Sequence, residues 1–281
     1  QLDRGDTENK SRIKLPIATV NNIQVYYEIH GEGEPAVCMG GWGTYCHKDG
    51  RGLARGLTDR YQVLIFDYRG IAQSRDDLHI PASMKLYAAD LIGLLDQLGW
   101  QQVHLIGLVG MGCGVAQEVA LSRPELVRSM VNMGAWSSVD DYLRDQLKLF
   151  RTVHREVGFY AFQQFVCIYS FLPEFYNQNK HRLLGPDGEW GELRDNYVTH
   201  ERLVDACLTH DTTNRLKDIT TPTLVIHAAK DMVTSPRTTL PIEQGISDAE
   251  GVTMENTAHV VAGKAQKIEF CNILFSFLEK H

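Results

Sequence analysis

Long hydrophobic runs and paired cysteines are both missing from this chain of 281 residues. No apolar run reaches the roughly 18–20 residues that cross a bilayer, which argues against a membrane protein. Positive charge is in deficit, because 28 Lys and Arg face 35 Asp and Glu, and the net charge of −7 argues against nucleic acid or an anionic membrane as partner. None of the six cysteines forms a Cys-x-x-Cys pair, so we interpret them as free, mostly buried thiols in a reducing cytoplasm.

Signatures of bound cofactors are also absent from the sequence. There is no phosphate-binding loop and no cluster with metal-ligand spacing, and His227 and Asp231 are expected on a loop rather than on one helix face. The glycines from Gly107 to Gly114 resemble a dinucleotide-binding loop only loosely, and the acid that would hold a ribose is missing. We therefore expect no cofactor and no metal.

Short apolar runs alternate with amphipathic stretches along most of the chain, which predicts βαβ units and a mostly parallel sheet. Residues 18–29 are expected to form a hairpin that turns at Asn21-Asn22. Residues 84–98 have helical spacing and are followed by Gly99, a typical helix stop. The further strands are predicted at 36–39, 62–66, 103–108, 126–133, 223–227 and 252–254, and the further helices at 115–121 and 268–278.

Residues 137–209 break this alternation, since they are helical in pattern and rich in aromatic side chains. One interpretation is that these helices only pack against the sheet domain, and another is that they form a lid over an apolar pocket. The predicted organisation is a polar leader over residues 1–17, a core made of residues 18–136 and 210–281, and a helical cap over residues 137–209.

Five stretches in one order carry a family resemblance. They are Gly40-Gly41-Trp42-Gly43, Asp67-Tyr68-Arg69-Gly70, the run from Gly110 to Gln117, Asp231 and His259. This pattern resembles the α/β-hydrolase superfamily, and within it the 3-oxoadipate enol-lactonase and small ester hydrolase group. The resemblance implies an α/β fold with a mostly parallel eight-stranded sheet, helices on both faces and a helical cap.

The resemblance assigns an acid and a histidine. Asp231 follows the strand at 223–227, where the family places its acid, and His259 lies in the loop before the last helix, where the family places its histidine. Asp231 would fix the tautomer of His259, which would then act as general base and acid near neutral pH.

The nucleophile of the family is missing. Its Gly-x-Ser-x-Gly turn falls near Gly107, but counting back from the following helix puts Gly110 in the place of the serine, while counting forward from the strand puts Val109 there. A third register gives Gly112, and none of the three residues has a hydroxyl group. Cys113 is the nearest nucleophilic side chain, and we interpret it as a buried packing residue.

Two backbone N–H groups, those of Trp42 and Met111, match the positions of the family's oxyanion hole. The site predicted from sequence therefore consists of His259 and Asp231 as catalytic residues, Gly110 at the vacant nucleophile position, and Trp42 and Met111 as oxyanion donors.

Three functions are consistent with this site. The first is an enzyme that acts on a small, largely apolar ester, lactone or carbon–carbon bond without a covalent nucleophile. The second is a serine hydrolase inactivated by a Ser-to-Gly change, and the third is a ligand-binding protein that has lost its chemistry. We favour the first, expect a small molecule as the partner rather than nucleic acid or membrane, and leave a homodimer open as the assembly state.

Overall fold

The computed structural model describes residues 16–281 and contains one eight-stranded sheet in the order β1-β2-β4-β3-β5-β6-β7-β8. β1 pairs antiparallel with β2, and β2 pairs antiparallel with β4, whereas the remaining neighbours are parallel. The predicted α/β fold with a mostly parallel eight-stranded sheet is therefore confirmed. The strands are β1 (Ile17–Val20), β2 (Ile23–His30), β3 (Glu34–Met39), β4 (Tyr61–Phe66), β5 (Val103–Leu108), β6 (Val127–Met133), β7 (Thr223–Ala228) and β8 (Ala249–Met254).

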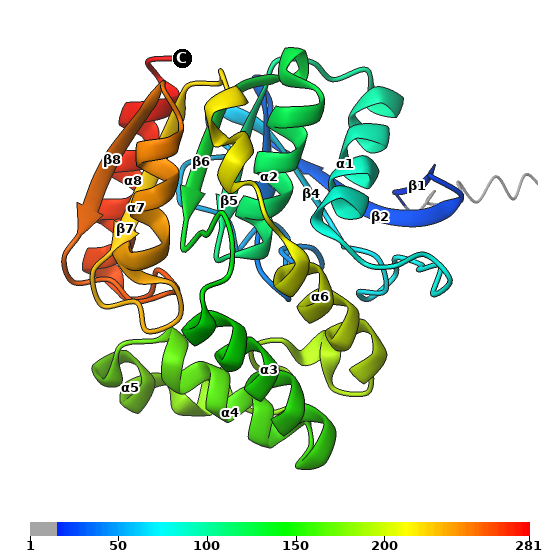
Figure 1. Cartoon of the computed structure of the whole chain (residues 1–281), viewed down its shortest axis with the longest axis vertical. Helices are drawn as coiled ribbons and strands as arrows, with labels where there is room; N and C mark the ends of the chain where they lie inside the picture. The colour runs from blue at the N-terminus through cyan, green and yellow to red at the C-terminus, as the bar shows by residue number, and fades with distance from the viewer. Residues whose placement is uncertain (1–15) are drawn as a thin grey trace, which may run out of the picture.

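Helices cover both faces of the sheet (Figure 1). One apolar cluster joins one face to α1 (Met84–Leu98), α2 (Met111–Ser122) and α7 (Ser235–Gly245), while a second cluster joins the other face to α8 (Lys264–Leu278). Central strands such as β3 contribute alternate residues to the two clusters, as expected for strands buried on both sides.

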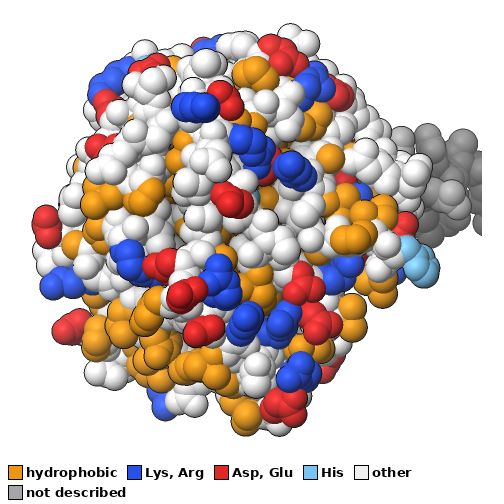
Figure 2. Space-filling model, viewed as in Figure 1, with side chains coloured by type: hydrophobic (Ala, Val, Ile, Leu, Met, Phe, Trp, Pro, Cys, Tyr) orange, Lys and Arg blue, Asp and Glu red, His pale blue; other side chains and the backbone are white. Residues whose placement is uncertain are grey.

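Four helices stand between β6 and β7, and we call them the cap helices. They are α3 (Asp141–Glu156), α4 (Phe159–Ser170), α5 (Pro173–Leu183) and α6 (Tyr197–Thr209). They gather at one end of the sheet in Figure 1, and Figure 2 shows apolar side chains concentrated over the same region. Leu149, Tyr160 and Ile168 are among the exposed large apolar residues of α3 and α4.

Several boundaries differ from those expected. Residues 1–15 of the predicted leader lie outside the described residues, and Ile17, which we had placed in the leader, pairs with Tyr26 in the first hairpin. α2 begins four residues earlier than the predicted helix at 115–121, and α7 was not predicted. Within residues 16–281, no helix is both long enough and apolar enough to cross a membrane.

Candidate active site

The turn between β5 and α2 contains two residues with a positive φ in succession. β5 ends at Leu108, α2 begins at Met111, and the two residues between them, Val109 and Gly110, have φ angles of 50° and 75°. A β-branched residue such as valine rarely adopts a positive φ, so this turn is strained. The one-residue disagreement between the two sequence counts falls on this pair.

Gly110 directly precedes α2, the place that a nucleophile occupies at such a strand-to-helix turn. A Cβ atom built on Gly110 would lie 2.5 Å from Cζ3 and 2.8 Å from Cη2 of Trp136. Trp136 is only 4% exposed, so its indole is held in place by its surroundings. The ring of Trp136 therefore occupies the space that a side chain at position 110 would need.

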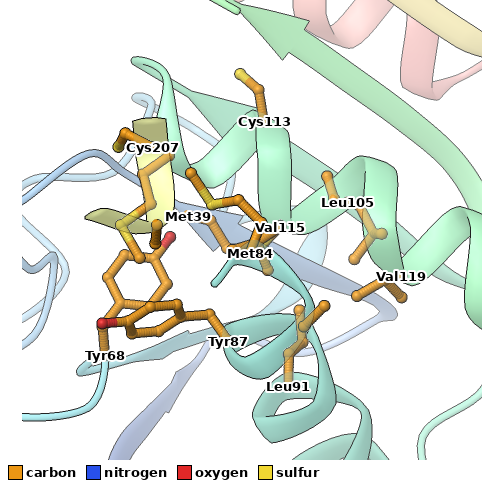
Figure 3. Close-up of a cluster of buried hydrophobic side chains, with 14 of the residues drawn as sticks. Met39, Tyr68, Met84, Tyr87, Leu91, Leu105, Cys113, Val115, Val119 and Cys207 are labelled. Atoms are coloured by element: carbon orange, nitrogen blue, oxygen red, sulfur yellow. The ribbon is translucent and has the colours of Figure 1, made fainter. Parts of the chain in front are cut away.

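Neither Gly112, the third register, nor the nearby Cys113 supplies a nucleophile. A Cβ on Gly112 would lie 2.4 Å from the carbonyl oxygen of Met39, so this glycine allows α2 to pack closely against the end of β3. Cys113 is fully buried, and its Sγ lies 3.2 Å from the carbonyl oxygens of Gly107 and Met133. Burial raises the pKa of the Cys113 thiol to about 12, and Figure 3 shows the residue on α2 among the buried side chains.

Asp231 lies in the loop after β7 and is held by three hydrogen bonds from that loop. The backbone N–H groups of Val233 and Thr234 donate to its Oδ1 at 2.7 and 2.9 Å, and the Thr234 hydroxyl donates to its Oδ2 at 2.5 Å. Burial by itself would raise the pKa of Asp231, but the charge and hydrogen bond of His259, with the bonds from Thr234, lower this pKa to about 2. The carboxylate is therefore ionised at neutral pH.

His259 Nδ1 lies 2.9 Å from Oδ2 of Asp231. Because the ionised carboxylate can only accept a hydrogen bond, Nδ1 carries the proton and Nε2 is left as the basic nitrogen. Nε2 has no hydrogen-bond partner among the described residues, and His259 lines a pocket beside Gly110.

Backbone hydrogen bonds bring the two loops together. The N–H of Lys230 donates to the carbonyl of Thr257 at 3.0 Å, which fixes the Asp231 loop against the His259 loop. The N–H of Val260 donates to the carbonyl of Ser170 at 3.0 Å, so the residue after His259 is attached to the last residue of α4. The position of the histidine thus depends on β7, β8 and the cap helices together.

The two predicted oxyanion donors both line this pocket. Trp42 follows β3, and Met111 is the first residue of α2, where the helix dipole favours negative charge. In the part of the chain that the structure describes, neither backbone N–H group donates a hydrogen bond. Gly41 keeps the two loops close, since a Cβ on it would lie 2.9 Å from the Val109 carbonyl oxygen.

The pocket is small and largely apolar. Its volume is about 60 Å³, several times the roughly 10–15 Å³ that one water molecule needs. The cap helices supply Leu147, Phe150, Val166, Ser170 and Cys207 to its wall. Among residues 16–281, no group of three or more His, Cys, Asp and Glu side chains is placed to hold a metal ion.

Among the pocket residues that the sequence did not single out, Trp136 and Ser170 carry polar atoms. Trp136 comes shortly after β6, and its position at the carboxyl end of that strand was the signal that could have placed it near Gly110. Ser170 ends a cap helix, and nothing in the local sequence distinguishes it from the other polar residues of the cap. Four of the five predicted site residues line the pocket: Trp42, Gly110, Met111 and His259. The fifth, Asp231, contacts His259 and does not line the pocket.

The chain belongs to the alpha/beta hydrolase fold family, whose family model matches residues 29–263. Among curated proteins it is similar to two named "Putative carbamate hydrolase RutD". The protein from Azorhizobium caulinodans is 27% identical over 267 residues, covering 94% of this chain and 98% of that protein. The protein from Stutzerimonas stutzeri is 30% identical over 217 residues, covering 74% and 80% of the two chains.

Solved structures show the same fold at lower identity. The alpha/beta hydrolase MGS-M2 from a Medee basin deep-sea metagenome superposes with a TM-score of 0.83 at 22% identity, covering 94% of this chain and 97% of that one. The enol-lactonase from Burkholderia xenovorans LB400 superposes with a TM-score of 0.80 at 19% identity, covering 94% and 100%.

Proposed function

We propose that this α/β hydrolase cleaves a small, largely apolar carbonyl compound by direct attack of water, with His259 as the base and no acyl-enzyme. The observation that carries the proposal is the hydrogen-bonded pair of His259 and Asp231 at a pocket in which Gly110 offers no hydroxyl group. The name of the RutD relatives refers to carbamate hydrolysis, and a carbamate ester or amide is one substrate with a suitable carbonyl.

The chemistry follows from the protonation states. His259 Nε2 removes a proton from a water molecule as the water oxygen bonds to the substrate carbonyl carbon. The carbonyl π electrons move to its oxygen, and the resulting oxyanion accepts hydrogen bonds from the N–H groups of Trp42 and Met111. The oxyanion then collapses, the bond to the leaving group breaks, and the imidazolium returns its proton to that group. Asp231 stabilises the imidazolium through Nδ1 without itself being protonated.

The contact between Gly110 and Trp136 supports this proposal over an inactivated serine hydrolase. Replacing a serine by glycine would leave the space of the serine side chain free, whereas here the indole of Trp136 lies 2.5 Å from the Cβ position. A protein that only binds its ligand would not need an ionised carboxylate to orient the imidazole. The pair of Asp231 and His259 therefore weighs against a ligand-binding protein without catalytic activity.

Hydrolysis of 4-nitrophenyl acetate and phenyl carbamate by the purified chain tests the proposal. His259→Ala should lower kcat/KM by about 10²–10⁴-fold, because the general base is lost. His47→Ala is the matched control, since His47 also lies 2.8 Å from a buried aspartate, Asp67, but does not line the pocket. The control should change kcat/KM by less than about twofold, and equal losses in the two variants would contradict the proposal.

The absence of an acyl-enzyme needs a separate measurement. We expect no pre-steady-state burst of nitrophenol and no change in the intact mass of the chain during turnover. Labelling of any serine or cysteine by the acetyl group, at a rate matching turnover, would refute direct attack by water.

A further inference from the structure

Ser170 is a buried polar residue of the pocket wall that the proposed mechanism does not use. It is the last residue of α4 and is 1% exposed, and its Oγ has no hydrogen-bond partner among the described residues. A serine in a helix often donates to the carbonyl four residues earlier, here that of Val166, but this bond is not made. A buried hydroxyl without a partner costs about 1–3 kcal/mol, which points to a ligand that satisfies it.

The position of Ser170 relative to the base is fixed. Its carbonyl oxygen accepts the hydrogen bond from the N–H of Val260 at 3.0 Å, and Val260 directly follows His259. Ser170 and His259 both line the pocket, and their side chains make no direct hydrogen bond to each other. A molecule held between them can contact both.

The remaining wall restricts the charge of such a molecule. None of the residues lining the pocket is Asp, Glu, Lys or Arg. A carboxylate bound there would lose its hydration without gaining a Lys or Arg partner, which is costly. Besides Ser170 Oγ and His259 Nε2, Trp136 also brings an unpartnered polar atom to the lining, but its Nε1 lies on the edge of the indole opposite to the carbons that face Gly110.

We propose that Ser170 hydrogen-bonds a second polar group of the substrate, and that the pocket selects neutral compounds which carry this group beside the reacting carbonyl. The inference rests on the proposed function for the identity of the reacting carbonyl. The substrate class is then a small neutral ester, lactone or carbamate that bears a keto, hydroxyl or amide group a few bonds away from the bond that is cleaved.

Equilibrium binding tests this inference separately from catalysis. Three of the four tryptophans, Trp42, Trp136 and Trp190, line the pocket, so intrinsic fluorescence reports its occupancy. The measurements use the full chain with His259→Gln, so that hydrolysis does not consume the probes. The probes are methyl 4-oxopentanoate, methyl pentanoate, which lacks the ketone, and the 4-oxopentanoate anion, which lacks the neutral ester.

We expect the ketone to tighten binding by about two- to tenfold, the effect of one neutral hydrogen bond, and the anion to bind at least about tenfold more weakly than the ester. Adding Ser170→Ala should remove the advantage of the ketone. Adding Val166→Ala instead should preserve it, because this variant trims the pocket wall one turn earlier on α4 without removing a polar atom.

Two results would overturn the inference: an unchanged ketone advantage after Ser170→Ala, or equal affinity for anion and ester. Ser170→Ala should also leave the thermal midpoint unchanged or raised, since it removes an unpartnered hydroxyl, and a lowered midpoint would assign the serine a structural role instead. Failure of the proposed function would appear in the His259→Ala kinetics and would leave these binding ratios unaffected.

Discussion

The crowding of Gly110 by Trp136 leads to a specific prediction for Gly110→Ala. The added Cβ would lie 2.5 Å from Cζ3 of an indole that is 4% exposed, and the residue has a φ of 75°. Both the ring and the backbone therefore oppose the substitution. We expect Gly110→Ala to lower the free energy of unfolding.

The magnitude has two parts. A residue other than glycine at the φ of 75° and ψ of −89° of Gly110 pays about 1–3 kcal/mol for a sparsely populated backbone conformation, and forcing extra atoms into a packed core costs about 1–3 kcal/mol. The sum of about 2–6 kcal/mol is a large fraction of the roughly 5–15 kcal/mol that stabilises a typical domain. Gly110→Ser should destabilise the protein at least as much and should not produce a serine hydrolase.

Gly99→Ala measures the cost of a positive φ without crowding. Gly99 caps α1 in the left-handed region, with a φ of 69° and a ψ of 23°, and a Cβ on it would meet nothing within 4 Å, so only a backbone cost of about 1–2 kcal/mol applies. Urea unfolding at pH 7 should place Gly110→Ala about 1–4 kcal/mol below Gly99→Ala, because Gly110 adds the crowding by Trp136 and a less favourable ψ of −89°. Adding Trp136→Phe, which shortens the ring, should recover part of that difference. Equal losses in the two alanine variants would refute the reasoning.

The remaining predictions concern Asp231, two histidines and two cysteines. Asp231→Asn should lower kcat by about 10³–10⁴-fold in the 4-nitrophenyl acetate assay, because an amide holds the wrong imidazole tautomer, and a loss below tenfold would contradict this. Burial lowers the pKa of His200 to about 3 and of His210 to about 4, so the unfolded chain binds more protons below pH 6.5. The urea midpoint should therefore fall steadily from pH 6.5 to pH 4, and less so in His200→Phe; a flat profile would be inconsistent with these pKa values. Iodoacetamide at pH 8 should label the partly exposed Cys271 and spare the buried Cys113, as read by mass spectrometry of the folded chain.

Local sequence signals predicted the elements that depend on local physics. The hairpin turns at Asn21-Asn22, where both residues have a positive φ, and α1 spans residues 84–98 before its left-handed cap at Gly99. Asn and Gly adopt left-handed backbone more readily than other residues, so these turns could be predicted without the fold. The same holds for the central strands, whose continuous apolar runs are typical of a buried parallel sheet.

Elements that depend on tertiary packing were harder to predict from the sequence. α7 contains Pro236 and Pro241, which interrupt the helical pattern, yet it packs against β7. The start of α2 was placed too late because glycines at its first turn read as loop. In the structure, Gly112 packs closely against Met39 at the end of β3, and Gly114 packs against the side chain of Met84 on α1.

The pairing of Asp231 with His259 was predictable because family position specifies both residues. The contact of Trp136 with Gly110 was not, since it joins the ends of β5 and β6 through side-chain packing that no spacing in the sequence encodes. The unpartnered hydroxyl of Ser170 could not be predicted from the sequence either, because whether a hydroxyl group has a hydrogen-bond partner depends on its neighbours in the folded chain.

The hydrogen bond from the N–H of Val260 to the carbonyl of Ser170 joins α4 to the loop that carries His259. Any displacement of α4 away from the loop after β8 breaks this bond and removes a constraint on His259 in the same motion. The wall of the pocket and the placement of His259 therefore share one hydrogen bond, so a change in the position of α4 is transmitted to the loop that carries the histidine.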